Sequence, residues 1–207
     1  SPRIDALRPA RERPALLKLV ARFALQHRPP TGFLRDIVVE HSGEHAGRLD
    51  LKAGGALPIT DLARWAGLAA GVTSASTRER LRAAGAAGSL PPEDARTLEE
   101  AFDLVFGLRL DHQVAQLRQG DEPDDFIDPT ALNPLARGYL KEAFRAVASV
   151  QKRVAGELGL SGKPGLPPMK YWFALHCLVR FSLHSPIILI KTSTIWGSNC
   201  LPDCSLI

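Results

Sequence analysis

Apolar residues recur at helical spacing through most of the first 160 residues. Residues 15–27 predict a helix, and Pro29 and Pro30 end it because proline cannot continue the hydrogen-bond ladder. Residues 32–40 predict a short second helix, although their IVVE sequence also fits a strand. The Gly-rich stretch 42–57 predicts a loop. Pro58 then suits the first turn of a helix that we expect to reach about residue 70.

The second half of this region predicts one shorter helix and two long ones. Thr77 is the expected cap of the shorter helix, which Gly85 and Gly88 close. The long helices are expected from Pro91 or Pro92 to about residue 119, and from Pro134, capped by Asn133, to about residue 158. The loop between them, GDEPDDFIDPTAL, is too polar and proline-rich to form an element. The long helices should pack antiparallel as the spine of a bundle, so the predicted fold is all-α, with no parallel α/β sheet.

Composition narrows the class of protein only slightly. Of 207 residues, 45% are hydrophobic and 23% are charged, as in an ordinary globular protein. The net charge is +4, but four of the 26 basic and one of the 22 acidic residues lie from Lys163 onward. That leaves 22 basic and 21 acidic residues before it, which gives little reason to expect a nucleic-acid partner.

The chain divides by composition into a lead-in (1–14), a helical body (15–160) and an atypical tail (161–207). All three cysteines lie in the tail, and the body without cysteine fits a reducing cytoplasm. The chain starts without Met or a signal peptide, as a fragment would. The apolar stretch 171–190 contains Arg180, two histidines and Pro186, which argues against a membrane anchor. We interpret the tail as non-native or frame-shifted; its detection by mass spectrometry of protein made from the native gene would contradict this.

Polar residues interrupt the apolar faces of the two long helices. Arg109, His112 and Gln113 continue the apolar line of the first, and Gln151 lies on that of the second. An unpaired buried polar group costs about 1–3 kcal/mol, so these side chains should pair or face a cleft. Two interpretations stay open: a satisfied structural network, and the polar wall of a substrate groove.

The stretch LDLKAGGALPITDLAR, residues 49–64, holds a second polar group. It contains Asp50 and Lys52, the pair Gly54–Gly55, and Asp61 one helical turn from Arg64. By spacing alone it is a cap, a tight turn and an i,i+3 pair, and the double glycine is weak evidence for phosphate binding. His41 and His45 have metal-like spacing, but no third ligand is identifiable and we predict no metal site.

The order of several motifs resembles the nucleotidyltransferase substrate-binding domain family, over about residues 16–158. The motifs are HRPPTGFLRDIVVE, LDLKAGGALPITDLAR, TRERLRAAG, AFDLVFGLRLDHQVAQL, DPTALNPLARGYLKEAF and VQKRV. This family is similar to the helical regions of protein-PII uridylyltransferase and glutamine synthetase adenylyltransferase. The adenylyltransferase has an Asp–Ile–Lys, a Gly-Gly pair and Arg–Asp–Ile–Glu, from which Pro58 and Thr60 depart.

The resemblance implies a domain that is not catalytic by itself. Such domains follow a nucleotidyltransferase domain, often with CBS and cyclic-nucleotide-binding domains, in bacterial proteins. That domain, which we expect upstream of this chain, would bind Mg²⁺ and a nucleoside triphosphate through a Gly-Ser turn and an Asp-x-Asp pair. Asp124–Asp125 lacks the Gly-Ser turn, so we do not interpret it as catalytic.

Two functions follow from the resemblance. In the first, the body binds a substrate, such as a PII-like protein, and presents it to the catalytic domain. In the second, it is a regulatory interaction module, which an exposed apolar patch on the long hairpin would favour over a polar cleft. The residues that we expect to face the substrate or nucleotide are Asp50, Lys52, Gly54, Gly55, Asp61, Arg64, Arg109, His112 and Gln113.

Overall fold

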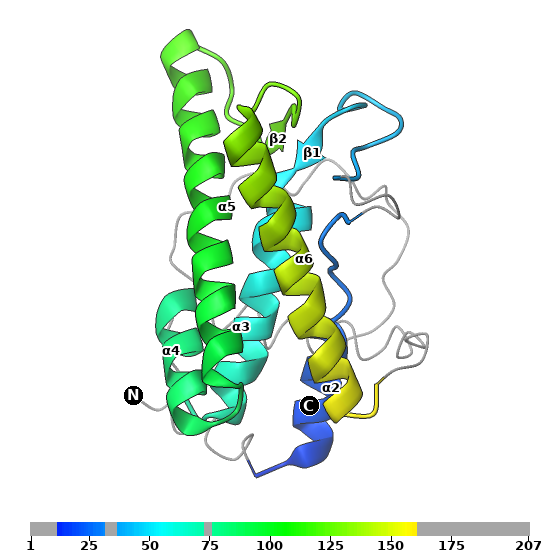
Figure 1. Ribbon diagram of the computed structural model, residues 1–207, viewed down its shortest axis with the longest axis vertical. Coiled ribbons are helices and arrows are strands. Elements are labelled where there is room, and N and C mark those ends of the chain that lie inside the picture. Colours follow the sequence, from blue (N-terminus) through cyan, green and yellow to red (C-terminus); the bar gives the residue numbers. More distant parts are fainter. Residues whose placement is uncertain (1–11, 32–36, 73–75, 161–207) are drawn as a thin grey trace, which may run out of the picture. The chain divides into compact units, whose positions relative to one another are not determined.

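A computed structural model describes residues 12–31, 37–72 and 76–160 of the protein. Helices dominate this part of the chain, and a two-stranded antiparallel sheet joins two of its loops (Figure 1). The predicted all-α class is therefore confirmed. The elements are α2 (Pro14–Ala24), β1 (Leu49–Asp50), the π-helix η1 (Leu51–Ala56), α3 (Leu57–Ala69), α4 (Thr77–Ala87), α5 (Pro92–Gln119), β2 (Phe126–Ile127) and α6 (Pro134–Glu157).

The two long helices form the predicted antiparallel hairpin. Figure 1 shows α5 and α6 side by side. The residues at which the two helices begin and end agree closely with those predicted from the sequence. Gly120 ends α5 with φ of 83°, a left-handed conformation that glycine adopts without strain. At the start of α6, the side chain of Asn133 accepts a hydrogen bond of 2.8 Å from the Ala136 N–H, as predicted for its cap.

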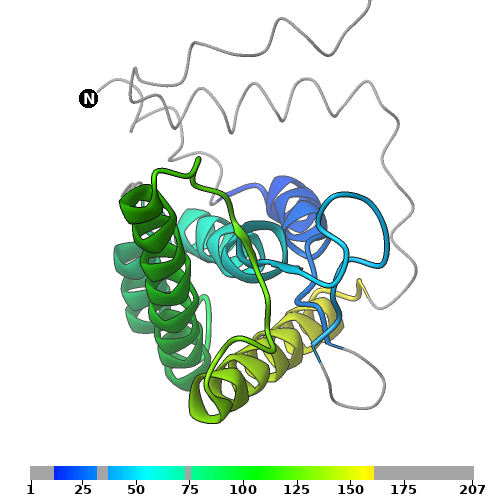
Figure 2. The same cartoon turned by 90° about the horizontal axis from the view of Figure 1, so that it is seen from above.

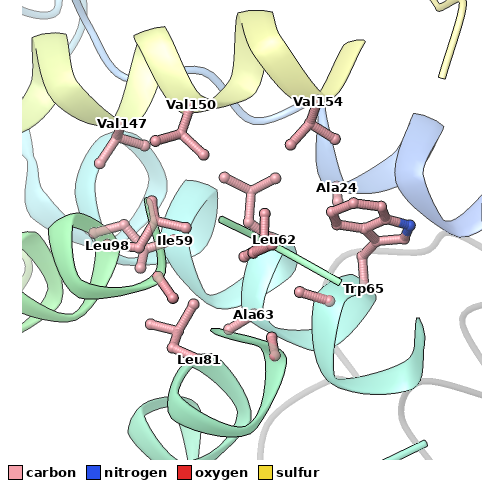
Figure 3. Close-up of a cluster of buried hydrophobic side chains, with 14 of the residues drawn as sticks. Ala24, Ile59, Leu62, Ala63, Trp65, Leu81, Leu98, Val147, Val150 and Val154 are labelled. Carbon is pink, nitrogen blue, oxygen red and sulfur yellow. The ribbon is translucent and has the colours of Figure 1, made fainter. Parts of the chain in front are cut away.

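Helix α3 lies at the centre of the bundle. Seen from above, α2, α5 and α6 surround it, and α4 packs along it (Figure 2). Apolar side chains from all five helices meet there, which explains why α3 is buried on most of its surface (Figure 3). The members drawn and labelled are Ala24, Ile59, Leu62, Ala63, Trp65, Leu81, Leu98, Val147, Val150 and Val154.

A second, smaller core lies under the two strands. Leu51, Val105 and Phe144 are almost completely buried there, with Leu49, Ala56, Ile127 and Leu140. Gly55 makes this packing possible, since a Cβ atom at that position would lie 2.6 Å from Cγ1 of Val105. The glycine therefore sets how closely η1 approaches α5.

The structure corrects the prediction for the loops on either side of the small sheet. The expected loop 42–57 contains β1 and η1, and the expected loop between the long helices contains β2. A strand of two residues is too short to show an alternating pattern, and a π-helix has no apolar period that the sequence reveals.

The remaining corrections concern helix ends. Residues 37–40 are not helical, and Ile37 forms an isolated bridge with Thr31; residues 32–36 lie outside the described part. The first helix ends at Ala24 rather than residue 27. Ser76, not Thr77, caps α4, and Gly85 lies inside that helix while Gly88 ends it.

Among the described helices, none has the length and apolar character that a bilayer span requires, and the tail lies outside them.

Candidate functional site

The short sheet brings together two stretches that the sequence separates widely. Asp50 pairs with Phe126, and the Leu51 N–H donates a hydrogen bond of 2.9 Å to the Asp125 carbonyl. The segment with Asp50 and Lys52 therefore lies beside the loop that follows α5. We refer to the polar side chains of that loop and the last turns of α5 as the hairpin-end cluster: Arg109, His112, Gln113, Gln116, Asp124 and Asp125.

Hydrogen bonds connect the members of the hairpin-end cluster to one another. Arg109 forms an ion pair with Asp125, which also accepts a hydrogen bond of 2.8 Å from Gln113. His112 Nε2 lies 2.8 Å from an oxygen of Asp124. The side chains of Arg109 and Asp125 are only 25% and 17% exposed, so each charge is compensated where water is scarce. These contacts fasten the loop to α5, and a substrate-facing role for the same side chains stays a prediction.

Asp124 is the member of this cluster with a perturbed pKa. Burial works to raise the pKa of its carboxyl group, but hydrogen bonds from His112 and the Phe126 N–H outweigh burial. The pKa therefore lies below its usual value, and the carboxylate stays charged in the folded protein. Arg48, 3.9 Å away, adds a further positive charge beside it.

Asp50 and the double glycine shape η1. One carboxylate oxygen of Asp50 accepts hydrogen bonds of 2.8 Å from both the Lys52 and Ala53 N–H groups. A Cβ atom at position 54 would lie 3.0 Å from Cδ of Pro30, so Gly54, like Gly55, permits close packing. Lys52 itself is exposed, and its ammonium group makes no ion pair with the part of the chain that the structure describes.

Asp61 contacts Arg64 within α3 and His27 beyond the end of α2. The Asp61 carboxylate accepts a hydrogen bond of 2.7 Å from Arg64, which confirms the i,i+3 pair, and lies 2.8 Å from Nδ1 of His27. Gln151 on α6 donates a hydrogen bond of 2.7 Å to the His27 carbonyl. The polar Gln151 on the apolar face is therefore satisfied, and it ties α6 to the end of α2.

Arg64 has a second positive charge beside it. Its Nε atom is buried, and no described residue accepts a hydrogen bond from it. Arg80 on α4 is half-buried, and burial together with the charge of Arg64 lowers the pKa of Arg80. The spacing of the motifs LDLKAGGALPITDLAR and TRERLRAAG, which contain these arginines, did not predict this interaction.

Sequence reasoning missed several residues that hold these groups in place. Asp124 and Asp125 belong to a loop that we expected to be irregular, yet they bind the polar residues of α5. Buried Asp94 accepts hydrogen bonds from Arg153 and joins the start of α5 to the end of α6. A signal existed for Asp94, since an acid with no basic residue on its own helix face must find a partner on another element.

The histidine spacing near residue 41 does not produce a metal site in the structure. Within residues 12–31, 37–72 and 76–160, no three His, Cys, Asp or Glu side chains are grouped so that they could hold an ion. His45 instead stacks on Phe126 with 3.6 Å between ring centroids, which places it against β2.

An apolar stripe runs along the outer surface of α5. Phe106, Leu110 and Leu117 are spaced by four and seven residues, which places them on one face of the helix. They are 40%, 49% and 60% exposed. On α6, Leu135 and Tyr139 are also exposed. We call the first three residues the α5 stripe; it is the patch that the interaction-module hypothesis requires.

A family model matches the helical body of the chain. Residues 14–158 match the model of the family described as "Putative nucleotidyltransferase substrate binding domain". The chain belongs to this family. The matched residues begin at α2 and end just after α6, so the family's domain coincides with the bundle around α3. No curated protein and no solved structure matched the chain.

Proposed function

We propose that the helical body binds the substrate of a nucleotidyltransferase domain, which carries out the transfer. The observation that carries this proposal is the position of Lys52 within a domain of the substrate-binding family. Its side chain is exposed on η1, while the backbone beneath it is fixed by Asp50 and by the packing of Gly54 and Gly55. A rigid backbone that presents an uncompensated cation is suited to bind an acidic or phosphorylated group.

The substrate in this proposal is a PII-like signalling protein in a bacterial cell. The catalytic domain would supply the Mg²⁺ and the nucleoside triphosphate, and CBS or cyclic-nucleotide-binding domains would regulate it. Family membership supports the association with a nucleotidyltransferase, and the resemblance to protein-PII uridylyltransferase supports the nature of the substrate. Lys52 would bind the acidic group, while Arg109 would act only through the loop that it holds with Asp125.

Steady-state nucleotidyl transfer to a PII-like protein tests this proposal, in the protein that carries this body together with its catalytic domain. Lys52→Ala should raise KM for the protein substrate by about tenfold and change kcat little, because a lost charge-assisted contact weakens binding. Lys152→Ala, which removes another exposed lysine from α6, is the matched control. Equal KM values for the two variants would contradict the proposal.

The α5 stripe favours a second candidate function, a regulatory interaction module. Exposed apolar side chains at helical spacing are typical of a surface that another domain covers. Leu110→Ser with Leu117→Ser should abolish association with a catalytic, CBS or cyclic-nucleotide-binding domain in sedimentation experiments. Leu135→Ser on α6 is the control, because Leu135 is 64% exposed but lies outside the stripe. Unchanged association would exclude this use of the stripe.

A further inference from the structure

Two arginines from different helices meet beside Gly67. The side chain of Arg80 lies along α3, and its Cγ, Cβ and Cδ atoms are 3.0, 3.1 and 3.3 Å from the position of a Cβ atom at residue 67. Arg64 precedes Gly67 by three residues, so it lies on the same side of α3. The missing side chain at residue 67 is what lets Arg80 reach this place.

The positive charge at this place exceeds the negative charge. The Asp61 carboxylate is shared between one amino group of Arg64 and His27, which leaves the buried Nε–H of Arg64 without an acceptor. No acid among the described residues pairs with the guanidinium of Arg80.

The neighbours of Arg80 on α4 show that this arrangement is unusual within the helix. Arg78 donates a hydrogen bond of 2.6 Å to Asp103, and Arg82 donates one of 2.5 Å to Glu99, both on α5. Arg80 packs against Gly67 of α3 instead, where the positive charge of Arg64 acts on it. Placing two half-buried cations together is unfavourable unless something else compensates them.

We propose that Arg64 and Arg80 bind a phosphoryl group between α3 and α4. Guanidinium groups offer forked donors that match phosphate oxygens, and the partly exposed side chains of Arg64 and Arg80 supply such donors. A phosphoryl group would also compensate the positive charge that Asp61 leaves uncompensated. This site goes beyond the proposed function and does not rest on it. A nucleotide tail and free inorganic phosphate carry the same chemistry.

Calorimetric titration of the full chain tests the site, with orthophosphate, pyrophosphate, ATP and adenosine at constant ionic strength. We expect the three phosphate compounds to bind and adenosine to give no signal. Arg80→Met keeps the aliphatic packing on Gly67 and removes the charge, and it should weaken pyrophosphate binding about tenfold or more. Tighter binding of ATP than of pyrophosphate would identify a nucleotide as the ligand, and equal binding would identify the phosphoryl group alone.

Two further variants separate binding from folding. Arg82→Met removes a charge two residues away and should bind pyrophosphate like the wild type. Gly67→Ala leaves both arginines in place but displaces the stem of Arg80, and it should also weaken binding. Absence of phosphate binding by the wild type would overturn the proposal. Equal affinities of Arg80→Met and Arg82→Met, with both variants folded by circular dichroism, would overturn it too.

Discussion

The hairpin-end cluster and the Arg64–Arg80 pair both consist of partly buried polar side chains, but they differ in how far their charges are compensated. In the cluster, Arg109 has Asp125 and His112 has Asp124, and the backbone of the loop is bonded as well. Beside Gly67, one carboxylate, that of Asp61, binds Arg64 and His27, and Arg80 has no acidic partner among the described residues. A partly buried polar residue is therefore uninformative about function by itself. Whether its charge is compensated within the protein separates a structural group from a candidate for binding.

The largest expected loss of stability comes from removing an acid of the hairpin-end cluster. Asp125→Ala removes the partner of Arg109 and an acceptor for Gln113, and it leaves a charge with little access to water. We expect a loss of about 3 kcal/mol in the free energy of unfolding, measured by urea denaturation. Arg109→Met in the same background should recover part of this loss. An additive double variant would show that the two side chains do not interact.

A second variant tests the scaffold beneath that region. Gly55→Ala places a methyl group 2.6 Å from Cγ1 of Val105, so η1 must move away from α5. Overpacking of this kind costs about 1–3 kcal/mol. Val105→Ala should restore stability to Gly55→Ala although it is destabilising alone. Failure of this rescue in thermal unfolding would show that the contact does not limit packing.

The hairpin-end cluster should also make the free energy of unfolding depend on pH in the acid range. Because the folded pKa of Asp124 lies below its ordinary value of 3.8, the folded protein holds the charged form more strongly than the unfolded chain does. Its contribution is present above that value and is lost as pH falls through the folded pKa. Asp124→Asn should therefore flatten the decline in stability below about pH 4 in acid titrations. An unchanged decline would contradict this role.

The smallest change in stability is expected for Arg64 and Arg80, and it is a gain in stability rather than a loss. Without ligand, Arg80→Met removes a half-buried cation beside Arg64, and we expect the melting temperature to rise by a few degrees at most. Arg82→Met, which breaks an exposed ion pair with Glu99, should lower it slightly or not at all. A marked fall for Arg80→Met would show that Arg80 stabilises the fold.

The long elements could be predicted from the sequence because their signals are local. Asn133 followed by Pro134 marks the start of α6, and Gly120 marks the end of α5. The strands β1 and β2 could not be predicted, since each has two residues and exists only through its partner.

In the candidate site too, contacts within one element could be predicted from the sequence, and contacts between elements could not. The contact between Asp61 and Arg64 lies within one helix and was predicted from their spacing. The ion pair of Arg109 with Asp125 and the electrostatic interaction of Arg64 with Arg80 join separate elements, and nothing in the spacing of those residues specifies them. Residue types showed that the polar side chains needed partners, but only the fold shows which partners they have.

The short sheet also bears on the order in which the chain folds. Leu49 and Ile127 are neighbours across the sheet, yet α3, α4 and α5 all lie between them in the chain. Closing so long a loop costs more entropy than forming the contacts between successive helices, so we expect the strands to pair late. The amide of Leu51, bonded to the Asp125 carbonyl, should then gain protection from hydrogen exchange after the amides of α3 and α5 during refolding. We therefore expect the sheet to form only after the helices have packed into the bundle.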